Sequence, residues 1–119
     1  MPVRSSNSPV LKWPGKTEVL GSLWDWLQAQ QSRHPELVRL GYAGSYARGD
    51  WGVGSDLDLI AIVTGTTEPF HRRGLSWDVN ALPVPVDLLI YTVSEWEAII
   101  AEQSRFARTI QREAVWIFP

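Results

Sequence analysis

The apolar run from Leu57 to Val63 is interrupted only by Asp58. It is much shorter than the ~20 apolar residues that a membrane-spanning helix requires. Its length is typical of a strand, and we predict one over residues 56–63. Two further short apolar segments predict strands at 37–42 and at 84–91, the latter with prolines at its start, where a strand tolerates them best. A sheet of short strands is therefore expected.

Segments with helical periodicity lie between and after these strands. An apolar stripe predicts a helix from Thr17 to about Arg33, and Pro35 is expected to end it because the residue before a proline avoids the helical region. The stripe consists of Leu20, Leu23, Trp24 and Leu27. A second stripe follows the strand predicted at 84–91, after a capping-box signature at Ser94 and Glu97. Its members are Trp96, Ile99, Ile100, Phe106, Ala107 and Ile110.

The order of these segments predicts a layered α/β or α+β domain, with the helices on one face of the sheet. A chain of 119 residues is expected to form one domain. Residues 1–15 contain several prolines and show no period, so we expect a flexible N-terminal arm there and a single domain over 16–119. Residues 66–83 are expected to form a long loop or a short extra element, and residues 114–118 a short final strand.

Composition excludes several classes of protein. With no cysteine, the chain has neither a disulfide nor a thiolate zinc site, and a cytoplasmic location is the natural expectation. A hydrophobic content of 45% with 20% charged residues is ordinary for a globular protein and excludes disorder. The net charge of −2 argues against direct, unspecific nucleic-acid binding. No segment predicts a membrane anchor.

Three aspartates carry the most informative pattern. Asp56 and Asp58 share one face of their strand, roughly 6.6 Å apart, because alternate side chains point the same way. Asp87 stands on a later strand, and it comes within reach of the other two if the strands are adjacent and in register. Ligands that are all oxygen suit Mg²⁺ or Mn²⁺. Two such ions are typical of phosphoryl or nucleotidyl transfer.

Gly44 and Ser45 precede Asp56 by ten intervening residues and fit the other half of such a site. A glycine lets backbone amides approach a phosphate, and a serine hydroxyl adds a donor at the start of a short helix. Arg48, one helical turn later, is a further candidate for phosphate binding. Ser55 either contacts a phosphate or caps the turn before the aspartates.

Simpler interpretations stand beside these hypotheses. Asp87 could be an edge charge or pair with Arg39 or Arg73, Ser45 could only cap a helix, and Arg48 could lie on a solvated face. Among the tryptophans, Trp24 and Trp96 are expected in the core. Trp26, which falls off its stripe, and Trp51, near the glycine turn, could each be a partner surface or a platform for a base.

The combination resembles the nucleotidyltransferases of the DNA polymerase β superfamily, especially their minimal (MNT-type), single-domain members. Those proteins carry Gly-Ser, about ten residues, Asp-x-Asp, and a third Asp on a later strand, as residues 44–45, 56–58 and 87 do here. The resemblance implies a polymerase β palm-like fold, with a small mixed β-sheet backed by helices. It assigns catalysis and metal binding to Asp56, Asp58 and Asp87. Nucleotide binding then falls to Gly44, Ser45, Arg48 and Ser55.

The resemblance also implies a reaction and a partner. Small members use two Mg²⁺ (or Mn²⁺) ions to transfer a nucleoside monophosphate, most often AMP from ATP, to a hydroxyl. They resemble antitoxins that modify a tyrosine of a helical HEPN-type toxin. One alternative is a nucleotide-binding antitoxin subunit that acts by complex formation alone. A standalone enzyme for a small-molecule hydroxyl is disfavoured because the chain has no second lobe. The acceptor, the base and the number of assembled copies stay open.

Overall fold

The computed structural model describes residues 13–119, so most of the predicted arm at 1–15 lies outside the described residues. The elements are α1 (Lys16–Arg33), β2 (Leu37–Ala43), α2 (Ser45–Arg48), β3 (Leu57–Val63), the 3₁₀ helices η2 (Phe70–Ser76) and η3 (Val79–Ala81), β4 (Val86–Thr92), α3 (Val93–Glu102), α4 (Arg105–Glu113) and β5 (Val115–Phe118). Within residues 13–119, no helix is long and apolar enough to cross a membrane.

The four strands form one sheet in the order β4-β3-β2-β5. The central strand β2 is antiparallel to both β3 and β5, whereas β3 and β4 are parallel. Parallel neighbours require a crossover connection, which the chain makes through the segment that holds η2 and η3. The sheet is therefore mixed, as the sequence resemblance implies, and the predicted final strand is present as β5.

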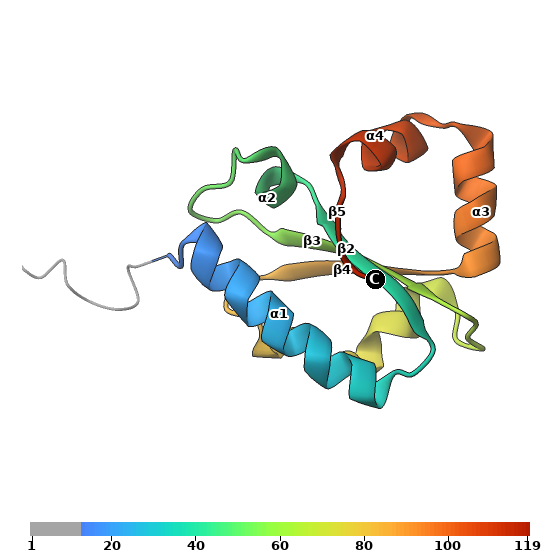
Figure 1. The fold of residues 1–119 in the computed structure, drawn as a ribbon, viewed down its shortest axis with the longest axis horizontal. Helices are drawn as coiled ribbons and strands as arrows, with labels where there is room; N and C mark the ends of the chain where they lie inside the picture. The colour runs from blue at the N-terminus through green and yellow to red at the C-terminus, as the bar shows by residue number, and fades with distance from the viewer. Residues whose placement is uncertain (1–12) are drawn as a thin grey trace, which may run out of the picture.

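Helices cover both faces of the sheet, so the expectation of helices on one face is wrong. Alternate β3 side chains, beginning with the buried Leu57 and Leu59, join the core formed with α1. The intervening Ile60 and Ile62 join a second, smaller core with Trp96 of α3 and residues of α4. Figure 1 shows α1 on one side of the sheet and α3 and α4 on the other. A strand that is buried on both faces has a nearly continuous apolar sequence. This explains why residues 57–63 are apolar throughout except at Asp58.

The buried stripe of α1 differs from the predicted one. Trp24, expected in the core, is 49% exposed, whereas Trp26 is 4% exposed. The indole N–H of Trp26 donates to the carbonyl of Asp78 at 2.7 Å, and its ring lies 6.2 Å from that of Trp77. The segment around η3 therefore supplies the burying partner, which helical spacing alone does not reveal.

The second predicted stripe is divided between two helices. Gln103 ends α3 in the left-handed region at φ 51°, and the Ser104 hydroxyl caps α4 by accepting from the amide of Ala107 at 3.2 Å. The predicted capping box at Ser94 and Glu97 is also wrong, because Thr92 and Glu95 form it two residues earlier. Helix α3 therefore begins directly at the end of β4.

The segment 66–83 is tied to α3 by a partly exposed ion pair. Arg73 of η2 meets Glu95 at 2.7 Å and 3.1 Å and also donates to the carbonyl of Ile90 at 3.0 Å. The guanidinium of Arg73 and the amide of Thr92 together lower the pKa of Glu95 to about 2. These contacts give the segment, whose predicted extra element is the pair of 3₁₀ helices, a structural role.

Candidate active site

Asp58 and Asp87 are direct neighbours across two parallel strands. The β3–β4 register pairs their Cα positions, which fulfils the condition set by the sequence pattern. Asp56 lies just before β3 and is exposed. The alternative of an ion pair from Asp87 to Arg39 or Arg73 is wrong, because Arg73 binds Glu95 and Arg39 stacks on a tryptophan. The structure thus brings the predicted carboxylates to one end of the sheet.

The surroundings of Asp58 raise its pKa. Burial contributes most, followed by the charges of Asp87 and Asp56, while Arg48 acts in the opposite direction. Glu113 adds a further, smaller negative influence. Because like charges disfavour ionisation, this group of carboxylates is the kind of environment that a bound cation stabilises.

Gly44 makes the close approach between the first strand and Asp58 feasible. Its φ of 71° and ψ of −150° put it outside the regions that residues with a β-carbon adopt. A β-carbon built there would lie 2.1 Å from Oδ2 of Asp58, an impossible contact. The cause is the β2–β3 pairing, which sets Ala43 opposite Asp58 immediately before the turn into α2. Glycine is therefore required at this position on two independent grounds.

Glu113 is a member of this site that the sequence analysis missed. Its Oε2 accepts a hydrogen bond from the amide of Gly44 at 2.8 Å, and its Oε1 lies 3.3 Å from Nη1 of Arg48. Its side chain is only 12% exposed. The β2–β5 register pairs Tyr42 with Val115, and continuing that register two residues places 113 opposite 44. The pairing of β5 with β2 therefore places Glu113 in the site, and the sequence alone does not specify that pairing.

The remaining predicted residues have more ordinary surroundings. Ser45 is the first residue of α2 and makes no side-chain capping bond, so the interpretation of Ser45 as a helix cap is wrong. Arg48 is half exposed and pairs with Asp50 at 3.1 Å as well as with Glu113. The Ser55 hydroxyl accepts from the amide of Gly52 at 2.8 Å, so it caps the turn. Trp51 stacks on Tyr46 with 5.7 Å between the ring centroids.

A cavity of about 300 Å³ brings together some of the predicted site residues, whereas Ser45, Ser55 and Asp56 do not line it. Its polar lining comes from Gly44, Arg48, Asp58, Asp87, Thr109 and Glu113, and its apolar lining from strand residues and from Phe106 and Ile110 of α4. In Figure 1, α2 and α4 both lie above β3 and β4, with β2 and β5 running between the two helices. The cavity is therefore an acidic cleft with a glycine turn at one wall and one arginine.

Residues 26–117 match the profile of the nucleotidyltransferase domain family. The chain belongs to this family. The match includes β2, the glycine turn, all three aspartates and most of β5. It confirms the resemblance drawn from the Gly-Ser and aspartate motifs, and a search of curated proteins finds no match.

Solved structures support the nucleotidyltransferase fold. A protein from Sulfolobus solfataricus assigned to the nucleotidyltransferases aligns with a TM-score of 0.60 at 19% identity, covering 85% of this chain and 80% of that one. A toxin–antitoxin structure with AMP-PNP aligns with a TM-score of 0.54 at 18% identity, covering 88% of this chain and 73% of that one. At these identities the similarity establishes the fold.

The donor set of this nucleotidyltransferase fits a hard divalent cation. Within residues 13–119, no group of three or more His, Cys, Asp or Glu side chains is arranged as a ready-made metal site. The available ligands are carboxylate oxygens, which Mg²⁺ and Mn²⁺ prefer, and the charges of Asp56 and Asp87 already act on Asp58. Mg²⁺ commonly binds through one or two carboxylates together with substrate phosphates, so a site completed by the nucleotide agrees with this geometry.

Proposed function

We propose that the chain is a metal-dependent nucleotidyltransferase that moves AMP from ATP to a hydroxyl, with a tyrosine of a helical HEPN-type toxin as the acceptor. The observation that carries the proposal is the parallel register that pairs Asp58 with Asp87, next to the turn at Gly44. Carboxylates from adjacent strands beside a glycine turn suit the binding of a nucleoside triphosphate with its cations.

The three aspartates have distinct roles in this proposal. Asp56 and Asp58 would hold both cations, and Asp87 would complete the second site. The chemistry that two Mg²⁺ ions supply is charge stabilisation at the transferred phosphorus and on the departing pyrophosphate. Asp87, the exposed member of the Asp58–Asp87 pair, accepts or positions the proton of the incoming hydroxyl.

The bond changes follow from these positions. The acceptor oxygen forms a bond to the α-phosphorus in line with the bond that breaks, and pyrophosphate leaves with that electron pair. The hydroxyl proton passes to Asp87 or to solvent beside it. Ser45 and the turn at Gly44 bind the β- and γ-phosphates, and Arg48 offers them a positive charge.

A protein acceptor suits the openness of the site. The chain contributes one sheet with its helices, and Asp87 lies on the exposed rim of the cleft. A partner is then needed to present the hydroxyl and to exclude water from the reacting atoms. The similarity to a structure of a toxin–antitoxin pair with AMP-PNP supports a toxin as that partner.

One observation favours a second candidate function, an antitoxin subunit that acts by binding alone. Glu113 already accepts the Gly44 amide and pairs with Arg48, two of the groups assigned to the nucleotide. A site whose anion-binding donors are occupied by its own carboxylate would hold a triphosphate weakly unless Glu113 moves. The two functions differ in whether a product forms.

The experiment incubates the purified chain with α-labelled ATP and Mg²⁺, with and without the protein encoded by the neighbouring gene, the candidate toxin. The proposal expects label on the partner only when both proteins are present. A stable complex that carries no label under either Mg²⁺ or Mn²⁺ would contradict catalysis and favour the binding subunit.

A further inference from the structure

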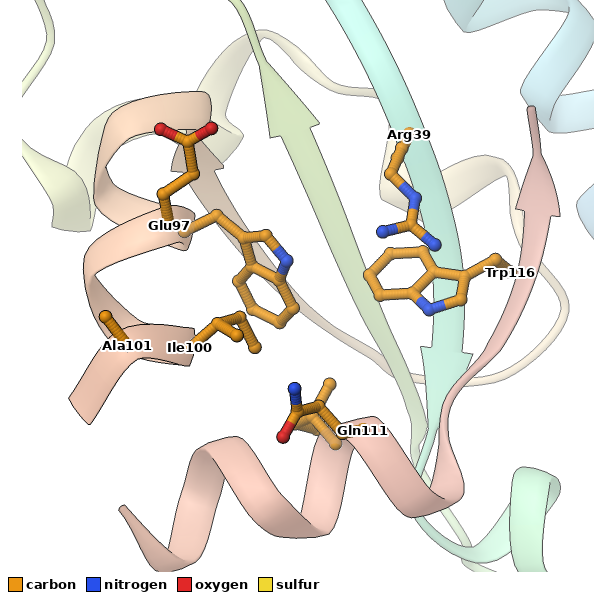
Figure 2. Close-up of a pocket in the computed structure, with 8 residues that line it drawn as sticks. Arg39, Glu97, Ile100, Ala101, Gln111 and Trp116 are labelled. Carbon is orange, nitrogen blue, oxygen red and sulfur yellow. The ribbon is translucent and has the colours of Figure 1, made fainter. Parts of the chain in front are cut away.

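A second cavity of about 470 Å³ lies on the same face of the sheet as the aspartates. Ile110 of α4 lines both cavities and so separates them. Figure 2 shows the second cavity between α3, α4 and the strands β2 and β5. It is lined by Arg39, Trp96, Glu97, Ile100, Ala101, Ile110, Gln111 and Trp116. None of the residues assigned to nucleotide or metal binding belongs to it.

The walls of this cavity are aromatic. Trp96 and Trp116 meet edge to face, with 5.8 Å between ring centroids and 81° between ring planes. Ile100 and Ile110 complete the apolar lining. Burying an apolar side chain against a surface of this kind lowers the free energy, and indoles are frequent anchors at protein interfaces.

The polar groups at this cavity are mainly donors. The Arg39 guanidinium lies 3.9 Å above the Trp116 ring, and among residues 13–119 no carboxylate forms an ion pair with it. In Figure 2 the Glu97 carboxylate points away from Arg39 and Trp116, while the amide end of Gln111 faces the cavity. Arg39 is a half-buried cation over an aromatic ring, and no carboxylate in the described part of the chain pairs with it. Such a cation favours the binding of an anionic ligand.

Helix α4 carries three further arginines on its exposed side, outside the lining of either cavity. Arg105, Arg108 and Arg112 are exposed, and none is in a salt bridge with another described residue. The chain as a whole carries a net charge of −2, so the exposed side of α4 is positive against the overall balance. Negative groups on a partner would be attracted to the side formed by Arg39 and α4, away from Glu97 on α3.

We propose that the cavity at Arg39, Trp96 and Trp116 is the docking site for an acidic segment of the acceptor protein. An apolar side chain of that segment packs against the two indoles, and a neighbouring carboxylate binds Arg39. The inference rests on the proposed function in one respect, that the acceptor is a protein. Arg39 and Ala43 are four residues apart on β2, about 13 Å, so a segment held at Arg39 places its protein beside the Asp58 cleft.

The test uses the full chain without nucleotide or metal and a defined probe, the blocked peptide Ac-Glu-Leu-Glu-Phe-Glu-NH₂. The indole N–H signals of the seven tryptophans are followed by two-dimensional NMR during titration. We expect shifts at Trp96 and Trp116, a weaker response at high salt, and little response to the basic peptide Ac-Lys-Leu-Lys-Phe-Lys-NH₂. Equal binding of the two peptides, or no shift at these indoles, would overturn the proposal.

Two variants make the test specific. Arg39→Gln is expected to weaken the acidic peptide at least about tenfold, because a charged hydrogen bond is lost. The exposed Arg33→Gln on α1 makes the same charge change and should bind as the wild type does. If Arg39→Gln fails to fold, Gln111→Glu sets a carboxylate at the exposed rim and should weaken the acidic peptide instead. Unchanged affinity in the folded variant contradicts the site, and the label-transfer assay stays an independent test of catalysis.

Discussion

Gly44 and Asp58 approach so closely that a β-carbon on residue 44 would lie 2.1 Å from Oδ2 of Asp58. The contact joins the turn after β2 to the carboxylate of β3, and the β2–β3 register produces it. The same glycine donates its amide to Glu113 at the end of α4. One residue thus connects the predicted phosphate turn, the carboxylates proposed to bind metal and the C-terminal segment.

Gly44→Ala is expected to abolish transfer and to lower the free energy of unfolding by about 1–3 kcal/mol, since it combines a clash with an unfavourable φ. Gly21→Ala is the matched control, because a β-carbon there meets nothing within 4 Å. It should be neutral or should stabilise α1 by up to about 1 kcal/mol. Urea unfolding of both variants checks the prediction, and equal stability of the two would contradict the steric account.

Asp58 is expected to destabilise the metal-free fold at neutral pH. Its pKa is raised in the folded state by burial and by Asp87 and Asp56, so the charged form is less favourable than in the unfolded chain. Asp58→Asn should therefore melt at a higher temperature than the wild type near neutral pH. The difference should shrink as the pH falls through the raised pKa toward the ordinary value of 3.8.

Added Mg²⁺ should reverse the order of the two melting temperatures, so that the wild type melts above Asp58→Asn. A cation that binds only the folded wild type raises its melting temperature, whereas the Asn variant gains less. Melting curves with Mg²⁺ and with a chelator decide the matter. A wild type that melts at the same temperature with and without Mg²⁺ and nucleotide would argue against a metal at these carboxylates.

Glu113 is expected to hold the glycine turn in place. Glu113→Ala leaves the Gly44 amide without its acceptor and should cost about 1–3 kcal/mol of unfolding free energy. Glu113→Gln keeps an acceptor oxygen for that amide and loses only the partly exposed pair with Arg48, so it should cost less. Glu102→Ala, at an exposed position of α3, controls for loss of a glutamate. Equal losses in the Ala and Gln variants would contradict the hydrogen-bond role.

The Arg73–Glu95 pair predicts a second, opposite pH dependence. Its guanidinium and the capping amide lower the pKa of Glu95 from 4.5 to about 2, so the ionised form stabilises the fold. That contribution is present above the ordinary pKa and is lost as the pH falls toward the folded value. Glu95→Gln should lower the melting temperature near neutral pH, and the gap to the wild type should narrow between these two pKa values. A gap that is constant with pH would contradict this assignment.

Much of the sheet and part of the site could be predicted from the sequence. Strand periodicity locates the apolar runs, and Asp58 and Asp87 stand near the starts of two of them, so a parallel register is enough to join them. Glu113 could not be predicted because its place depends on the pairing of β5 with β2, a long-range choice that no local pattern encodes. The prediction that Trp24 rather than Trp26 is buried failed for the same reason. A long-range contact with the residues around Asp78 decides which of the two indoles is buried.

The most direct test of the central claim compares two charge-matched variants in the transfer assay with the partner protein. Asp58→Asn removes a carboxylate from the cleft, and Asp25→Asn removes one from the exposed surface of α1. The account predicts that Asp25→Asn labels the partner as the wild type does, while Asp58→Asn forms the same complex and transfers no label. Full labelling by a folded Asp58→Asn variant would contradict the assignment of this cleft as the active site.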